Sequence, residues 1–212
     1  MKKLLLFVPL LFCVSSVYAQ NAVDLNVGFG SAFDSSNGQG IDGSTFATCT
    51  PGVSGCLKTP DLSGFFLGFG GDVMFKEHFG GGFEYNVQPA RQAYGPFQSR
   101  VSFIDANGIY DPIVKKRFLV QLQGGLGVAK TSFAYTQSSC AGTAVCSSST
   151  QAVGTSNHFQ VHVGAGVQIA ITEHIFVRPQ FDLHYAPNLT DQFGRNSVPE
   201  ATVWVGYHWG SR

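Results

Sequence analysis

The sequence predicts an all-β fold, an eight-stranded antiparallel transmembrane up-and-down β-barrel, from three observations. Apolar and polar residues alternate along eight segments, the pattern of strands with one apolar and one polar face. Charged residues make up only 12% of the 212 residues, about half the usual share in a soluble domain. After the N-terminal segment, no uninterrupted apolar run is long enough for a transmembrane helix. A closed barrel is the other structure that satisfies its backbone hydrogen bonds in lipid.

The N-terminal segment has the layout of a secretory signal peptide. Lys2 and Lys3 precede an apolar run over residues 4–14, and Val17 and Ala19 fit the two positions read at a cleavage site. The apolar run is too short and too close to the N-terminus for a membrane anchor. We therefore expect residues 1–19 to be a signal peptide and residues 20–212 to form one outer-membrane β-barrel domain.

Seven of the alternating segments can be assigned an apolar and a polar face. One parity carries Phe, Val, Leu, Ile or Tyr, and the other carries mostly Gly, Gln, Asn, His and single charged residues. The apolar positions run over residues 23–29, 65–75, 83–87, 118–128, 159–171, 177–185 and 201–209. An eighth segment, residues 98–110, is also strand-like. Its orientation stays open, because Asp105 and Asn107 share parity with Val101 and Phe103.

The connections between these segments alternate strictly between long and short. The long ones are residues 31–61, 89–97, 136–157 and 187–197, and the short ones are residues 76–79, 111–116 and 172–174. Outer-membrane barrels have long extracellular loops and short periplasmic turns. The pattern therefore predicts that the short turns and both ends of the barrel face the periplasm.

The composition of the two faces indicates which one lies outside. A soluble barrel would also alternate, but it would need a charged exterior. Here the polar face is rich in Gly, Gln, Asn, Ser and Thr, which suits a narrow lumen, and the apolar face suits lipid. Aromatic residues fall near the strand ends, where interfacial girdles lie: Phe75, Tyr110, Phe118, Tyr135, Phe176, Tyr185, Tyr207 and Trp209.

Three stretches resemble small bacterial outer-membrane β-barrel proteins of the OmpA-transmembrane, OmpX and OmpW kind. They are residues 201–209 (ATVWVGYHW), which are similar to a terminal insertion strand, residues 121–128 (QLQGGLGV), and Gly206-Tyr207. The resemblance implies the outer membrane as location, and outer-membrane lipid, lipopolysaccharide and the barrel-assembly machinery as partners of a monomer. These families share an architecture rather than a catalytic motif, so the resemblance implies little about activity.

Four cysteines follow the predicted signal peptide, and four cysteines allow three pairings. Cys49 and Cys56 lie in the first long connection, and Cys140 and Cys146 lie in the third. In an oxidising compartment the short separations favour two loop-local disulfides, Cys49–Cys56 and Cys140–Cys146. A zinc site is the alternative. The spacings are too wide for typical knuckles, and neither loop has a nearby His.

The polar face carries most of the titratable residues of the predicted strands. These are Asp24, Asp72, Glu84, Asp182, Glu200, Arg178, His158, His162, His184 and His208. Eight strands leave an interior just wide enough to be filled by side chains, and charges inside it must be paired or solvated. We therefore expect a polar network that plugs the lumen, with Arg178 as the central cation paired with Asp72, Glu84 and Asp182.

Pro179, the next residue after Arg178, predicts an irregularity in the barrel wall. Proline cannot donate a hydrogen bond to its neighbour strand, and a closed barrel has no free edge. We therefore expect a β-bulge at Pro179, with its side chain toward lipid.

An enzymatic function is not expected. Residues 181–188 resemble the His-x-Ser-Asn stretch of outer-membrane lipid A deacylases, with His184 and Asn188 present. Ala186, however, occupies the place of the serine, and without a hydroxyl there is no nucleophile for acyl transfer. No other catalytic or cofactor-binding motif is present, and with equal numbers of acidic and basic residues, 13 each, there is no basic patch for nucleic acid.

The sequence therefore favours a non-enzymatic outer-membrane protein with a structural or surface role and no cofactor. The alternative is an OmpW-like conduit for small apolar solutes. A conduit would need an apolar stripe inside the lumen, for which Phe66, Met74 and Trp204 are the candidates. A lipid-modifying enzyme is the third and weakest hypothesis.

Overall fold

The computed structural model describes residues 22–35, 38, 40–42, 48–58, 61–94, 97–141, 145–189 and 193–210. The predicted signal peptide lies outside these residues. Within the described ranges, no helix is both long and apolar enough to cross a membrane.

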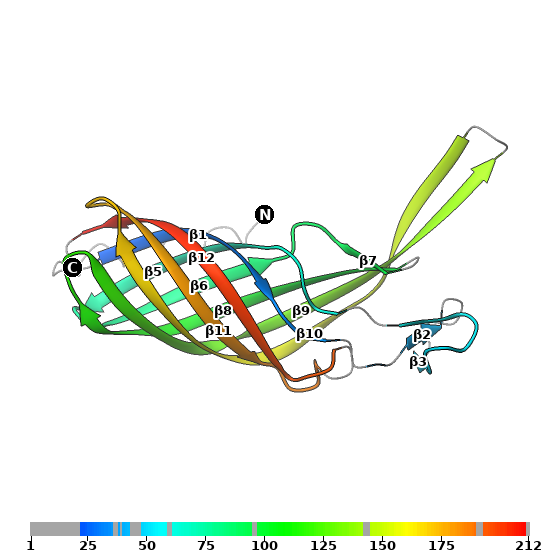
Figure 1. Ribbon diagram of the computed structural model, residues 1–212, viewed down its shortest axis with the longest axis horizontal. Helices are drawn as coiled ribbons and strands as arrows, with labels where there is room; N and C mark the ends of the chain where they lie inside the picture. The colour runs from blue at the N-terminus through cyan, green and yellow to red at the C-terminus, as the bar shows by residue number, and fades with distance from the viewer. Residues whose placement is uncertain are drawn as a thin grey trace, which may run out of the picture.

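Eight long strands pair in antiparallel fashion and close into a barrel, which confirms the predicted fold class (Figure 1). They are β1 (Ala22–Ala32), β5 (Phe66–Lys76), β6 (Phe79–Val87), β8 (Phe97–Val114), β9 (Phe118–Ala141), β10 (Val145–Ala170), β11 (Ile175–Tyr185) and β12 (Ser197–Trp209). Strands adjacent in the chain pair with each other, and β1 pairs with β12 to close the ring.

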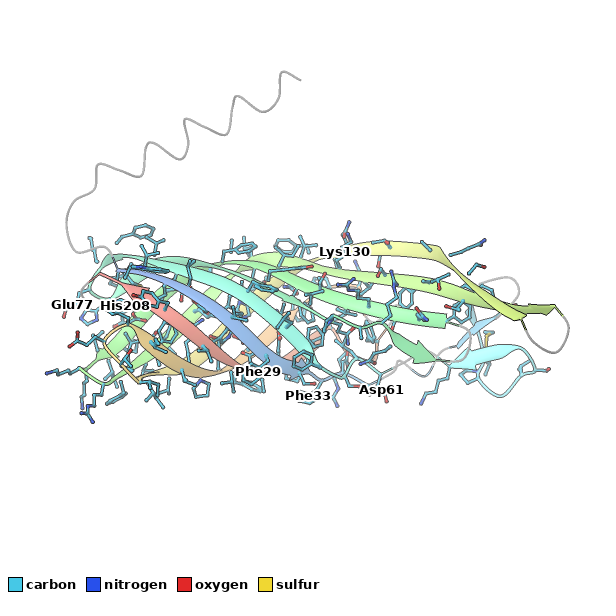
Figure 2. The ribbon with its side chains drawn as sticks, turned by 90° about the horizontal axis from the view of Figure 1, so that it is seen from above. Phe29, Phe33, Asp61, Glu77, Lys130 and His208 are labelled. Atoms are coloured by element: carbon cyan, nitrogen blue, oxygen red, sulfur yellow. A yellow bond between two sulfur atoms is a disulfide. The ribbon has the colours of Figure 1, made fainter. Side chains whose placement is uncertain are left out.

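Side chains alternate between lipid and lumen along every barrel strand, because successive residues of a strand point to opposite faces. Outward-facing Phe83, Leu126 and Phe181 are each more than half exposed, while inward-facing Glu84 and Asp182 are each only 1% exposed. The short turns and the C-terminal end of β12 gather at one end of the barrel, with Glu77 and His208, and Asp61 lies toward the other end (Figure 2). We call these the turn end and the loop end.

The structure also settles the orientation of β8, which the sequence left open. Phe103, Asp105 and Asn107 all point into the lumen, and Ile104 and Tyr110 point outward. The inner face of β8 passes from an apolar to a polar part of the lumen, so neither parity of this strand is uniformly apolar.

The first and second long loops contain short strands of their own. Strands β2 (Gly40–Asp42), β3 (Thr48–Cys49) and β4 (Cys56–Lys58) form a separate small sheet beyond the loop end of the barrel. A disulfide joins Cys49 to Cys56 within this sheet, as the sequence predicts. Strand β7 (Gln92–Tyr94) pairs with the first residues of β8.

The third long connection differs from the prediction of a loop over residues 136–157. Here β9 and β10 continue as a paired ribbon that extends beyond the barrel, as far as the pair formed by Ala141 and Val145 (Figure 1). The register shifts once, between Ala152 and Gly154. Outside the lipid the ribbon needs no apolar face, so its Ser- and Thr-rich strands lack the alternation by which the barrel strands were recognised.

Cys140 and Cys146 lie directly opposite each other in the backbone ladder of this ribbon. Their side chains lie outside the part of the chain that the structure describes. The Cys140–Cys146 disulfide therefore stays a prediction.

The prediction of a β-bulge at Pro179 is wrong. Pro179 pairs with Val203 of β12 in an unshifted register, and on the β10 side the pairs Gly166–Gln180 and Ile169–Val177 also share one register. A missing N–H removes a single ladder hydrogen bond but does not require an extra residue in the strand. The Pro179 side chain is exposed and Arg178 is buried, as the alternation requires.

Candidate functional site

The interior of the barrel is layered along its axis. At the loop end lies an apolar layer of Ala32, Leu62, Phe66, Val101, Phe103, Ala129, Ala186, Leu189, Phe193 and Val198. At the turn end lies a small apolar cluster of Ala22, Met74 and Ile109. Between them lies the polar and charged part of the lumen, which we call the central layer and which contains all four residues predicted to form the lumen network.

Arg178 of β11 holds the middle of the central layer. Its Nη1 donates to Asp72 Oδ2 of β5 at 2.7 Å, and its Nη2 donates to Glu84 Oε1 of β6 at 3.2 Å. Nη1 also donates to the Gln121 side-chain oxygen, and the guanidinium carbon lies 5.8 Å from the ring centroid of Trp204. These partners come from across the barrel, so Arg178 ties distant parts of the wall together.

Asp182 joins this cluster through two glutamines. The Gln180 amide nitrogen lies 3.1 and 3.2 Å from the two oxygens of Glu84, and 3.0 and 2.9 Å from those of Asp182. The Gln123 amide nitrogen bridges the same two carboxylates, at 2.9 Å from Glu84 Oε2 and 3.2 Å from Asp182 Oδ1. The structure therefore brings Asp72, Glu84, Arg178 and Asp182 into one connected network.

Two histidines stand beside this network as part of a stack of rings. The rings of His162 and His184 are stacked 4.7 Å apart, and the ring of Phe103 stacks on His184 at 4.4 Å. His162 Nε2 lies 2.9 Å from Asp182 Oδ1, and His184 Nε2 lies 2.9 Å from Glu200 Oε2. The network thus continues from Arg178 through two carboxylates to a pair of imidazoles.

Two kinds of residue in the central layer were not predicted from the sequence. Asp105, which lies 3.8 Å from His184 Nδ1, was missed because the phase of its strand was ambiguous. Gln121, Gln123 and Gln180 were recognised as inward-facing, but glutamine carries no charge that would single it out. Their position on the inner face beside the predicted ions was the signal that could have identified them.

The candidates for an apolar stripe lie in separate layers. Phe66 belongs to the loop-end layer, and Met74 belongs to the turn-end cluster. Trp204 lies in the central layer beside Arg178, and it is fully buried. The three side chains therefore do not line a continuous apolar path.

Residues from two loops close over the loop-end layer. The backbones of Asp34 and Leu62 are hydrogen-bonded to each other at 2.8 Å, and Gly194 N donates to Ser35 O at 2.6 Å. Leu62, Leu189 and Phe193 are each at most 2% exposed beneath this connection. We call these three side chains the lid.

The stretch similar to lipid A deacylases does not form a reactive group. His184 points into the lumen against Glu200, Ala186 is fully buried in the loop-end layer, and Asn188 is exposed with a positive φ of 66°. The three residues face different surroundings, and the central one has no hydroxyl.

Comparison with known proteins agrees with this architecture. The sequence profile of the outer membrane protein beta-barrel domain family matches residues 5–208. The structure is similar to that of Ail, the attachment invasion locus protein of Yersinia pestis, with a TM-score of 0.51 and 10% identity, covering 90% of this chain and 100% of that chain. It is also similar to Neisserial surface protein A, with a TM-score of 0.52 and 14% identity over 91% and 98% of the two chains. At these identities the structural likeness shows the fold alone. No curated protein sequence matches the chain.

Proposed function

Because the chain belongs to the outer membrane protein beta-barrel domain family, we propose that it is an integral outer-membrane protein with a structural and surface role, whose lumen is closed by its own side chains. The observation that carries this proposal is the filling of the lumen. Arg178, Asp72, Glu84 and Asp182 are each at most 1% exposed, and the lid lies above them. A plugged barrel of this kind presents its outer wall and its loops to partners rather than a passage.

The surface role rests on the elements beyond the barrel. The β9–β10 ribbon and the disulfide-linked β2–β3–β4 sheet both extend past the loop end (Figure 1). In outer-membrane barrels this is the extracellular side. We propose contact with molecules outside the cell through these two elements.

The remaining partners follow from the outer wall. Its exposed Leu, Val, Ile and Phe side chains suit outer-membrane lipid and, in the outer leaflet, lipopolysaccharide. We propose that the barrel-assembly machinery inserts the chain and that it works as a monomer without enzymatic activity. The absence of a hydroxyl at Ala186 and the engagement of His184 with Glu200 support the last point.

Single-channel recording of the refolded protein in planar bilayers tests the closed lumen. The wild type should give no steady unitary conductance. Arg178→Ala should give one, because it removes the side chain that ties Asp72 and Glu84 together. Lys130→Ala, a change at an exposed position of β9, is the matched control and should stay silent. A steady channel in the wild type would contradict the proposal.

A conduit for small apolar solutes is the second candidate, and the loop-end apolar layer favours it. A small apolar molecule could enter that layer if the lid opened. Binding of an apolar fluorescent probe, strengthened by Phe193→Ala and abolished by a larger polar residue at Ala186, would favour the conduit. Absence of probe binding in both the wild type and Phe193→Ala would remove it.

A further inference from the structure

The central layer holds far more acidic side chains than Arg or Lys side chains. Asp24, Asp72, Glu84, Asp105, Asp182 and Glu200 are each at most 1% exposed. Arg178 is the one Arg or Lys among the buried residues that the structure describes. Buried charges need a counter-charge, and Arg178 contacts Asp72 and Glu84 but reaches Asp182 only through glutamines. The acidic side chains near Asp182 therefore lack a direct contact with an Arg or Lys, and a further cation would balance them.

Three donor groups converge at this place from three strands. One oxygen of Glu84 from β6, one oxygen of Asp182 from β11 and one ring nitrogen of His162 from β10 all lie within 4.8 Å of one another. The three side chains are 1%, 1% and 0% exposed, respectively. They are anchored in the wall of a closed barrel, where Gly164 pairs with Asp182 and His162 pairs with His184. A rigid backbone thus holds two carboxylates and one imidazole around one point.

The side chain of Gln123 reaches the same point and carries an unpartnered polar atom. Gln123 is 7% exposed, and its amide nitrogen contacts both carboxylates, whereas its side-chain oxygen has no hydrogen-bond partner among the described residues. A half-turn of this amide would present the oxygen to the two carboxylates, and a cation between them would make that arrangement favourable.

The contacts of Gln180 and His162 show that the acceptors around this point outnumber the available hydrogens. The Gln180 amide nitrogen has two hydrogens but lies within 3.2 Å of four carboxylate oxygens. His162 has an oxygen acceptor on each side, Asn107 Oδ1 at 3.0 Å from Nδ1 and Asp182 Oδ1 at 2.9 Å from Nε2. A neutral imidazole can donate to only one of them, so its other nitrogen faces an oxygen with a lone pair.

From these observations we propose that Glu84, His162 and Asp182 form a binding site for one divalent transition-metal ion, with Gln123 Oε1 as a further ligand. Mixed carboxylate and imidazole donors suit Zn²⁺ and its neighbours among the divalent metals better than Mg²⁺ or Ca²⁺, which prefer oxygen alone. Asn107 supplies the outer partner: His162 Nδ1–H donates to its oxygen, which leaves the Nε2 lone pair for the ion. The ion enters as the barrel closes, because the finished site is buried.

Metal content after refolding tests the proposal. Untagged protein is refolded in detergent with Zn²⁺, separated from free metal and assayed by atomic emission in the fraction that shows the folded gel mobility. The wild type should hold about one Zn²⁺ per chain, and His162→Gln, Glu84→Gln and Asp182→Asn should each lower this at least tenfold. Two control variants should keep the ion. His174→Gln removes an exposed imidazole in a turn, and Asp24→Asn removes a buried carboxylate that contacts His208 rather than the proposed site.

X-ray absorption at the zinc edge of the wild type gives a second reading that needs no variant to fold. The expected spectrum has one imidazole and two or more oxygen ligands, at about 2.0–2.2 Å. The proposal is overturned if the wild type binds no metal, if the three site variants keep it, if His174→Gln loses it, or if the spectrum shows two imidazoles or none.

Discussion

Arg178 is the residue whose removal should cost the barrel most. Removing one member of a buried ion pair typically costs about 3–5 kcal/mol, because the remaining charge is left without a partner. We therefore expect Arg178→Ala to lower the free energy of unfolding in urea by that order. Arg178→Lys should lose less, since it keeps the charge but cannot reach both Asp72 and Glu84 as the guanidinium does.

The control for this measurement is Lys130→Ala, which changes an exposed cation and should shift the free energy by no more than about 0.5 kcal/mol. Equal unfolding midpoints for Arg178→Ala and the wild type would show that the central layer does not depend on this cation.

A second prediction at the scale of single residues concerns Trp204. Its position requires that Gly28 and Gly68 have no side chain. A Cβ at Gly28 would lie 2.6 Å from the Trp204 ring, and one at Gly68 would lie 2.5 Å from it. Trp204 is fully buried. Gly28→Ala and Gly68→Ala should therefore each destabilise the barrel by about 1–3 kcal/mol, as overpacking does.

Gly124→Ala is the matched change for this pair, because its Cβ would meet the nearest atom at an ordinary 3.7 Å. The free energy of unfolding of Gly124→Ala in urea should equal that of the wild type or slightly exceed it. A Gly124→Ala barrel as unstable as the other two would mean that the Trp204 contact is not the cause.

The same residues show what the sequence could and could not predict about the site. Strand parity placed Asp72, Glu84, Arg178 and Asp182 on the inner face. Parity says nothing about which inward side chain touches which, so the amide bridges of Gln123 and Gln180 came only from the structure. Contacts between strands far apart in the ring depend on its closure, which no local pattern encodes.

At the scale of elements, the β2–β3–β4 sheet should depend on its disulfide while the barrel should not. Cys49 and Cys56 are separated by seven residues and lie in a sheet separate from the barrel sheet. In Cys49→Ser/Cys56→Ser, we expect a protease to cut the first loop much faster, because the bridge no longer restricts the small sheet.

The urea midpoint of that double variant should match the wild type, since the barrel strands keep all their partners. A large fall in barrel stability would show instead that the loop sheet supports the wall.

Peptide mapping without reduction should also find Cys140 linked to Cys146, and a link between the two loops would refute both local pairings.

The two predictions at this scale that the structure overturns have different causes. Strands are predicted from apolar alternation, which lipid imposes on the barrel wall but not on the ribbon beyond it. The sequence therefore predicts a loop over residues 136–157, although Thr136 and Thr150 pair in a backbone ladder. At Pro179 the sequence predicts a bulge that the structure does not have, because the closed wall tolerates one missing hydrogen bond without changing register.

At the scale of the whole molecule, orientation in the membrane can be tested on intact cells. Thr155 lies on the exposed ribbon, and Glu77 lies on an exposed short turn at the opposite end. A membrane-impermeant maleimide should label Thr155→Cys on intact cells, but should label Glu77→Cys only after the outer membrane is permeabilised. The reverse result would invert the assigned topology.

Closure of the whole barrel should also give it resistance to detergent. A closed wall has no free edge from which to unravel, so it unfolds slowly. Unboiled samples should therefore run at a different position from boiled ones on a gel, and circular dichroism should show β-structure. A helical spectrum with no gel shift would contradict the fold.

The β9–β10 ribbon has a mechanical consequence. Each of its strands runs on into the wall, where β9 carries Gln121 and Gln123 and β10 carries His162. A pull on the ribbon tip is therefore transmitted as tension along the same covalent chains that hold the central layer. The register of the ribbon shifts once, between Ala152 and Gly154. Force applied to the ribbon would thus reach the central layer before it reached the short turns.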